Sequence, residues 1–188
     1  ERLDELAAAV RGLAARGLAS MGSMACTIWE GAWYLRSMED LMADMMMGDE
    51  RATVLFDRVT EHQVERIGLF ARAGCDIVQL GDDIGMQHTT MMSVGLWRDW
   101  LKPRLKRVID AGRAVKPGLL VFYHSCGYVL PFLDELIEIG VDMLNPVQVA
   151  AAGMDTAALK QRYGRNIGFW GGGCDTQRVL PYGTVDEV

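Results

Sequence analysis

The sequence of 188 residues lacks several features that would place it in a common class of protein. No run approaches the roughly 18 uncharged apolar residues that a membrane-spanning helix needs. The chain begins without the charged and then apolar leader of a secretory signal peptide. Its 19 basic residues are scattered among 25 acidic ones, giving a net charge of −6, and no basic patch with interleaved aromatic residues is present. These absences argue against a membrane partner and against nucleic acid.

Cysteine is also scarce, and the four cysteines are far apart: Cys26, Cys75, Cys126 and Cys174. Their spacing is not that of a disulfide framework, so we expect a reducing compartment and a cytoplasmic protein. In such a compartment a cysteine either fills the core or binds a metal. There is no linker or low-complexity tract, and the length suits one domain or part of one.

Hydrophobic residues recur at helical spacing in the first part of the chain. They predict a helix from Leu3 to Leu13 that ends near Gly17, then a strand over residues 18–24. Ser37 and Asp40 resemble a capping pair at the start of a methionine-rich helix. A longer helix is expected over residues 50–72. Its inward residues are expected to be Val54, Leu55, Val64, Ile67 and Phe70.

The rest of the chain alternates helices with short apolar strands. Three helices each end at a glycine, Gly74, Gly140 or Gly164, which we expect to adopt the left-handed C-cap conformation before an Asp or Asn and a strand. Another helix is divided at Pro103. The expected strands are residues 77–80, 119–123, 143–144 and 167–170.

This alternation predicts an α/β fold with a parallel sheet, and both a doubly wound sheet and a (β/α)8 barrel agree with it. No G-x-G-x-x-G follows any strand, which weakens the dinucleotide-binding form of the doubly wound sheet. A complete barrel needs about 250 residues. We therefore expect residues 1–188 to be the central part of a single (β/α)8 barrel domain, a fragment that lacks the N- and C-terminal parts of the barrel.

Polar clusters follow four of the expected strands, where parallel α/β folds place their reactive groups. Asp82 and Asp83 are adjacent, so one is expected to face the opening while the other caps or pairs locally. Four further residues suit hydrogen bonds to a polar substrate, although turn chemistry explains them equally well. They are Asn145, Gln148, Asp175 and Gln177.

His124 and Cys126 form the sharpest pair in the sequence. Two positions apart on an extended segment, their side chains point the same way. Imidazole nitrogen and thiolate are ligands that zinc prefers, and Gly127 lets the backbone turn away afterwards. A third ligand must come from elsewhere, either Cys174 or a cysteine beyond Val188. The alternative interpretation is a packed histidine beside an inert cysteine.

Taken in order, these motifs resemble the uroporphyrinogen decarboxylase superfamily, which includes decarboxylases and corrinoid-dependent methyltransferases. The matching stretches are Thr27–Glu30, Leu35–Glu39, Ala73–Asp76, Asp82–Gly85, Tyr123–Gly127, Gly140–Gln148 and Gly171–Gln177. The resemblance covers nearly the whole chain and implies a (β/α)8 barrel. Its methyltransferase branch uses a zinc site built from His-x-Cys-Gly and a later cysteine, and His124 and Cys126 match that motif.

The resemblance implies a zinc-dependent transfer of a methyl group between a corrinoid and a thiol acceptor. His124 and Cys126 are the expected zinc ligands, and with Asp83 they form the expected catalytic set, while Asp82 joins the substrate-binding residues. The implied partners are a small thiol, a tetrapyrrole or corrinoid, or a corrinoid protein. Two alternatives remain. One is cofactor-free decarboxylation of uroporphyrinogen, for which only Tyr34 is available as the catalytic tyrosine. The other is a corrinoid- or tetrapyrrole-binding protein without catalysis.

Overall fold

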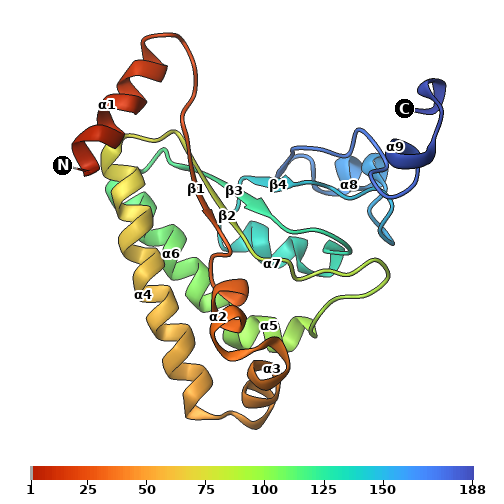
Figure 1. Cartoon of the computed structure of the whole chain (residues 1–188), viewed down its shortest axis with the longest axis horizontal. Coiled ribbons are helices and arrows are strands. Elements are labelled where there is room, and N and C mark those ends of the chain that lie inside the picture. The colour runs from red at the N-terminus through yellow and green to blue at the C-terminus, as the bar shows by residue number, and fades with distance from the viewer. Residues whose placement is uncertain (1) are drawn as a thin grey trace.

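The structure, a computed structural model, describes residues 2–188 and contains one sheet of five parallel strands (Figure 1). Each strand lies beside the next one along the chain, in the order β1-β2-β3-β4-β5, whereas a doubly wound sheet reverses its strand order. Within residues 2–188 the two outer strands are not paired with each other, so the sheet is open. The expected parallel α/β fold is confirmed. The strands are β1 (Met21–Ala25), β2 (Ile77–Gly81), β3 (Leu120–His124), β4 (Met143–Asn145) and β5 (Gly168–Phe169).

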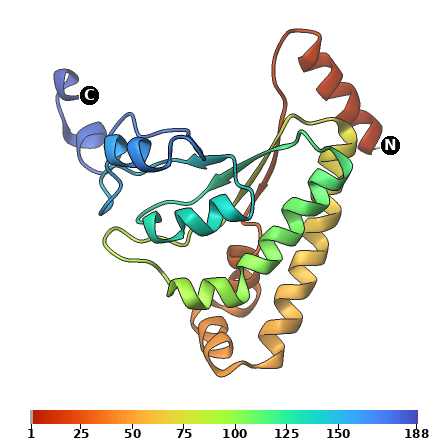
Figure 2. The same cartoon turned by 180° about the vertical axis from the view of Figure 1, so that it is seen from behind.

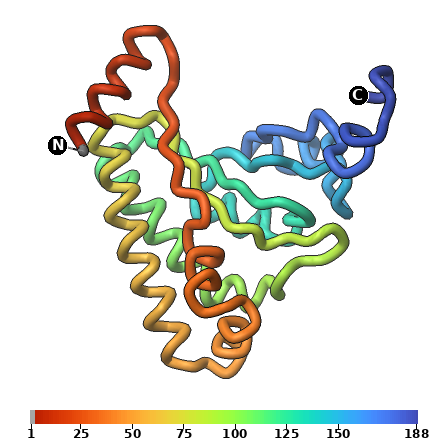
Figure 3. Tube along the Cα trace, viewed as in Figure 1, coloured from red at the N-terminus to blue at the C-terminus, as the bar shows by residue number. Residues whose placement is uncertain are grey.

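Helices precede and connect these strands, and α4, α6 and α7 lie on the same side of the sheet in both views (Figures 1 and 2). The trace in Figure 3 shows the N-terminal helix and the C-terminal segment at opposite ends of the molecule. No helix within residues 2–188 has the length and apolarity to cross a membrane. The helices are α1 (Arg2–Ala14), α2 (Trp29–Arg36), α3 (Met38–Met47), α4 (Glu50–Ala73), α5 (Val94–Trp100), α6 (Lys102–Val115), α7 (Leu133–Glu138), α8 (Thr156–Tyr163) and α9 (Val179–Tyr182), with 3-10 turns at Leu130–Phe132 and Val185–Glu187.

The inward face of α4 differs from the one that hydrophobicity alone predicts. Val54 is 52% exposed, so its expected place in the core was wrong. The buried stripe instead includes two polar residues, Thr60 and Gln63, in line with Phe56 and Ile67. Thr60 satisfies its hydroxyl by donating to the Phe56 carbonyl at 2.7 Å. A polar residue can be buried once it is hydrogen-bonded. The hydrophobic pattern of the sequence therefore does not reveal that these two polar positions belong to the buried face of α4.

Local signals placed most helix ends correctly. The Ser37 hydroxyl accepts from the N–H of Asp40 at 3.2 Å, as the capping pair predicts. Gly74 and Gly140 have the expected left-handed conformation, with φ of 92° and 98°. Gly164 does not, because its φ is −65°; a Cβ at this position would lie 2.5 Å from the Lys160 carbonyl oxygen.

The two faces of the sheet differ in what covers them. Val78, Val121 and Leu144 are buried on the helix side. Met21 and Leu120, which flank Ile77 in the strand register, lie on the other side and are 41% and 44% exposed. Since side chains alternate along a strand, His124 lies on the same open face as Leu120, at the carboxyl end of β3.

Candidate metal centre at the carboxyl edge of the sheet

The strand register brings the ends of β2 and β3 together. Gly81 is paired with His124, so the residues that follow each strand leave the sheet side by side. A Cβ at Gly81 would lie 2.5 Å from the His124 carbonyl oxygen, so only glycine permits this close approach. We call the loops that follow the strands at this edge the mouth.

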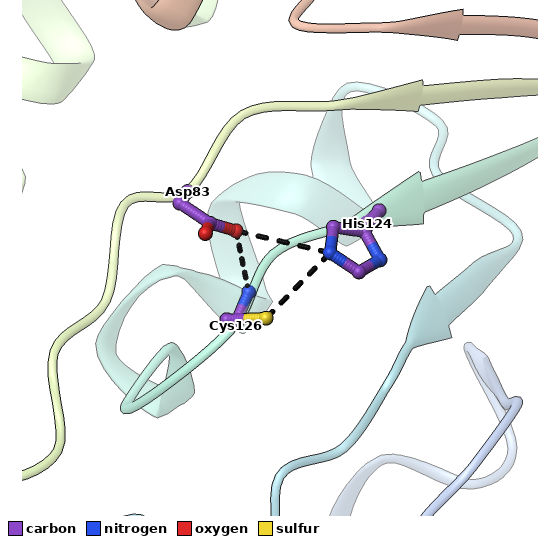
Figure 4. A group of neighbouring side chains, drawn as sticks. All are labelled: Asp83, His124 and Cys126. Carbon is purple, nitrogen blue, oxygen red and sulfur yellow. Dashed lines mark hydrogen bonds and ion pairs between the residues drawn. The ribbon is translucent and has the colours of Figure 1, made fainter.

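Three side chains converge in the mouth: Asp83 after β2, and His124 and Cys126 from β3 and its loop (Figure 4). The Cys126 sulfur lies 3.6 Å from His124 Nε2, and Asp83 Oδ1 lies 3.9 Å from the same nitrogen. One ligand atom from each of the three residues lies within 4.8 Å of the other two. The expected same-side arrangement of His124 and Cys126 is therefore present, and all three side chains are half-buried.

Backbone hydrogen bonds hold this arrangement. The N–H of Cys126 donates to Asp83 Oδ1 at 2.8 Å, which joins the β2 and β3 loops. The next N–H, that of Gly127, donates to Gln148 Oε1 at 2.9 Å. Gly127 has a φ of 79°, so the chain turns there as the sequence predicts. Gln148, expected to bind substrate, therefore uses its carbonyl oxygen to fix the loop beside Cys126.

Asn145 fixes the orientation of the His124 ring. Its Nδ2 donates to the Trp170 carbonyl at 2.8 Å, and a carbonyl can only accept. Oδ1 of Asn145 therefore faces His124 Nδ1, at 2.6 Å, and the proton of the neutral ring lies on Nδ1. Nε2 is left with its lone pair directed toward Cys126 and Asp83. Metal-binding histidines in proteins are oriented by such a bond from the other ring nitrogen.

The donor set agrees with the requirements of zinc. Tetrahedral zinc with ligands at about 2.0 to 2.3 Å sets its donor atoms about 3.3 to 3.8 Å apart. The 3.6 Å separation of His124 Nε2 and Cys126 Sγ lies in this range, and the 3.9 Å separation of Asp83 Oδ1 and Nε2 is just outside it. Nitrogen, sulfur and carboxylate oxygen are all zinc ligands. The three residues could hold zinc with little rearrangement.

The two adjacent aspartates have different environments, as expected for neighbouring residues whose side chains cannot both face the same way. Asp82 is 3% exposed and accepts from the N–H groups of Ile28 and Glu30 at the start of α2. Burial raises the pKa of Asp82 to about 7, although these N–H groups oppose the shift. Asp82 therefore caps α2 from inside the fold and is not placed to contact a substrate, whereas Asp83 faces the mouth.

Glu30 is a residue of the mouth that the sequence did not single out. Its Oε2 accepts from the N–H of Asp83 at 3.2 Å, and burial raises the pKa of Glu30 above its usual value. Burial, followed by the charges of Asp83 and Glu30, also raises the pKa of Cys126, so its thiol favours the protonated form. The signal for Glu30 in the sequence is its place in the first helical turn after a strand.

A cavity of about 140 Å³ lies beside Cys126. Cys174 and Gln177 line this cavity, but Cys174 is not a member of the three-residue group. Asp175 caps the following turn by accepting from the N–H groups of Gln177 and Arg178. The full lining is Cys126, Pro146, Val147, Gln148, Cys174, Thr176 and Gln177.

Comparisons with known proteins agree with this fold. The chain is similar in structure to a methyltransferase from Methanosarcina mazei, with a TM-score of 0.60 and 19% sequence identity. The similarity covers 81% of this chain and 42% of that one, so the chain spans less than half the length of the methyltransferase. No curated protein matches the chain in sequence. The family model described as uroporphyrinogen decarboxylase (URO-D) matches residues 1–168.

Proposed function

The chain belongs to the uroporphyrinogen decarboxylase family, and from that premise we propose that it is part of a zinc-dependent methyltransferase. The proposed reaction moves a methyl group between a corrinoid and a thiol acceptor. The observation that carries the proposal is the convergence of Asp83, His124 and Cys126 on one point. The similarity in structure to a methyltransferase supports the same branch of the family.

We also infer that the five strands are part of a (β/α)8 barrel and that residues 1–188 belong to its single domain. The unreversed strand order supports this inference, because a barrel adds each strand beside the previous one. The open sheet face supports it too, since parallel sheets are normally covered on both faces. Met21 and Leu120 on that face would then lie inside the barrel.

Asp83, His124 and Cys126 would hold the zinc ion, with the further ligands supplied by a thiol and by other residues, for which Cys174 is one candidate. Bound zinc would lower the pKa of a coordinated thiol and so maintain the thiolate that attacks a methyl group. The three ligands come from two loops joined by the Cys126–Asp83 hydrogen bond. That bond keeps the set assembled.

The surrounding residues have separate tasks in this proposal. Asn145 keeps the Nε2 lone pair of His124 available by holding the ring proton on Nδ1. Burial raises the pKa of Cys126, so its thiol favours the protonated form in the metal-free protein. Gln148 and Gln177 border the cavity beside Cys126 and are the proposed contacts of the substrate, together with Asp175, which lies between the lining residues Cys174 and Thr176 in the sequence.

Metal analysis of the full-length protein tests the proposal, combined with demethylation of methylcobalamin in the presence of a thiol. We expect about one zinc per chain and its loss in His124→Ala and Cys126→Ser. His62→Ala and Cys75→Ala are matched controls, because neither residue belongs to the converging group of Asp83, His124 and Cys126. An absence of zinc in the unaltered protein would contradict the proposal, and carbon dioxide release from uroporphyrinogen by a metal-free preparation would favour the decarboxylase alternative.

A further inference from the structure

The backbone donors beside the proposed zinc site are already occupied. Backbone N–H groups in loops are common binding groups for anions. In the loops after β2 and β3, six of them donate to partners within the chain, which leaves them unavailable to a ligand. The bonds are Asp83 N to Glu30 Oε2, Ile84 N to Ser125 Oγ, Ser125 N to Asn145 O, Cys126 N to Asp83 Oδ1, Gly127 N to Gln148 Oε1 and Tyr128 N to Met86 O.

The positive end of α2 is occupied in the same way. A helix N-terminus attracts anions through its free N–H groups and its dipole. Here the buried carboxylate of Asp82 accepts from Ile28 N at 3.0 Å and from Glu30 N at 2.9 Å. An anionic ligand would have to displace a carboxylate of the protein from this position.

In the loops after β2 and β3 the carboxylates are not accompanied by a lysine or arginine. Glu30 and Asp83 are both half-buried and joined through the Asp83 N–H. Among residues 2–188, no lysine or arginine is found paired with Asp83 or Glu30, and the 3.9 Å contact of Asp83 with His124 Nε2 is an ion pair only when the ring is protonated. The lining of the 140 Å³ cavity beside Cys126 is thiol, amide, hydroxyl and apolar, without a basic side chain.

We propose that the site selects substrates whose group entering the mouth is neutral or positively charged, that it discriminates against anionic thiols, and that Glu30 determines this preference. The inference rests on the proposed function and specifies its substrate class. If zinc is bound, its two positive charges are balanced by Asp83 and the Cys126 thiolate. Glu30 then remains as a negative charge without a lysine or arginine partner among residues 2–188, and the backbone N–H groups named above are already occupied.

Three thiosulfonate reagents of similar size measure this preference without any catalytic activity. Aminoethyl, hydroxyethyl and sulfonatoethyl methanethiosulfonate carry charges of +1, 0 and −1. In each reaction the cysteine thiolate attacks the sulfenyl sulfur, forms a mixed disulfide and expels methanesulfinate. The rate at Cys126 of the metal-stripped, full-length protein is followed by peptide mass spectrometry and divided by the rate for N-acetylcysteinamide, a neutral reference thiol.

We expect the ratio of aminoethyl to sulfonatoethyl rates at Cys126 to exceed that of the reference thiol by about tenfold or more. High salt should reduce this excess, because it screens the charges. Glu30→Gln should lower this excess by about threefold, because the amide oxygen can still accept from Asp83 N while the charge is lost. Glu61→Gln, a carboxylate on the surface of α4 that pairs with Arg58, should leave it unchanged.

The proposed charge preference would be overturned if the aminoethyl-to-sulfonatoethyl rate ratio at Cys126 were equal to or smaller than that of the reference thiol. An excess that Glu30→Gln leaves intact would overturn the assignment to Glu30. A second measurement uses the zinc-loaded protein, where calorimetry should give tighter binding for cysteamine than for 2-mercaptoethanesulfonate. Failure to bind zinc contradicts the proposed function while the thiosulfonate rates still decide the charge preference, so the two failures are distinguishable.

Discussion

Asn145 Oδ1 lies 2.6 Å from His124 Nδ1, and the Asn145 amide is itself fixed by the carbonyl of Trp170 at 2.8 Å. This relay runs from Trp170, the residue after β5, through Asn145 of β4 to His124 of β3. It decides which nitrogen of His124 faces Asp83 and Cys126. The imidazole therefore reaches the mouth in the tautomer that a metal requires.

Removing the relay should weaken metal binding without removing a ligand. For Asn145→Ala we expect zinc affinity to fall about 10-fold to 100-fold, measured by competition with a chromophoric chelator. Asn145→Asp should restore only part of the affinity, because a carboxylate also accepts from Nδ1 but cannot donate to the Trp170 carbonyl. Asn166→Ala, in the loop before β5, is the control and should bind zinc normally. Equal affinity in Asn145→Ala and the unaltered protein would contradict the assigned role of the relay.

The two adjacent aspartates should respond oppositely to substitution. Asp82→Ala should lower the free energy of unfolding by about 2 kcal/mol or more, because two N–H groups at the start of α2 lose a buried acceptor. Asp83→Ala should change stability less and zinc affinity more. Denaturant unfolding and zinc competition measure the two effects. A loss of zinc in Asp82→Ala with normal stability would show that the roles are reversed.

The close contact of β2 and β3 at the mouth depends on Gly81. Gly81→Ala should destabilise the protein by about 1 to 3 kcal/mol, because its Cβ would lie 2.5 Å from the His124 carbonyl oxygen in a packed sheet. The matched control is Gly12→Ala within α1, where no atom lies within 4 Å of the new Cβ. There we expect a gain of about 0.5 to 1 kcal/mol, because alanine favours helix. Thermal and denaturant unfolding compare the two.

Acid should weaken the packing of α7 against α5 and α6. Arg98 and Lys102 bind Glu135 and lower its pKa to about 2, from an ordinary value of 4.5. A carboxyl group with a lowered folded-state pKa stabilises the protein above its unfolded pKa, and this contribution disappears as the pH falls from about 4.5 to about 2.

Glu135→Gln should therefore be less stable than the unaltered protein at neutral pH, by about 1 kcal/mol, with the difference closing by pH 2. Glu61→Gln, whose partner Arg58 is 78% exposed, should show almost no difference at any pH. Urea unfolding at a series of pH values gives the comparison. A difference that persists at the lowest pH would show that the Glu135 contribution is not ionic.

Much of the architecture was predictable because local patterns determine it. Apolar runs placed the five strands to within a few residues, and Gly74 and Gly140 marked helix ends through a conformation that glycine favours. The pairing of His124 and Cys126 was predictable as well, since residues two apart on a strand share a face. Val54 and Gly164 were the local errors: the buried stripe of α4 includes polar residues in place of Val54, and Gly164 has a φ of −65°.

The sequence by itself determined the alternation of helix and strand, the family, and two of the three converging ligand atoms, because these follow from local periodicity and motif. Only the tertiary structure decided that Asp83 rather than Asp82 lies beside His124 and Cys126. It also decided that Asn145 orients His124 and that Glu30 accepts a hydrogen bond from the Asp83 N–H. Those contacts join residues 21 to 53 positions apart. Their geometry depends on the register between neighbouring strands, and no local pattern encodes that register.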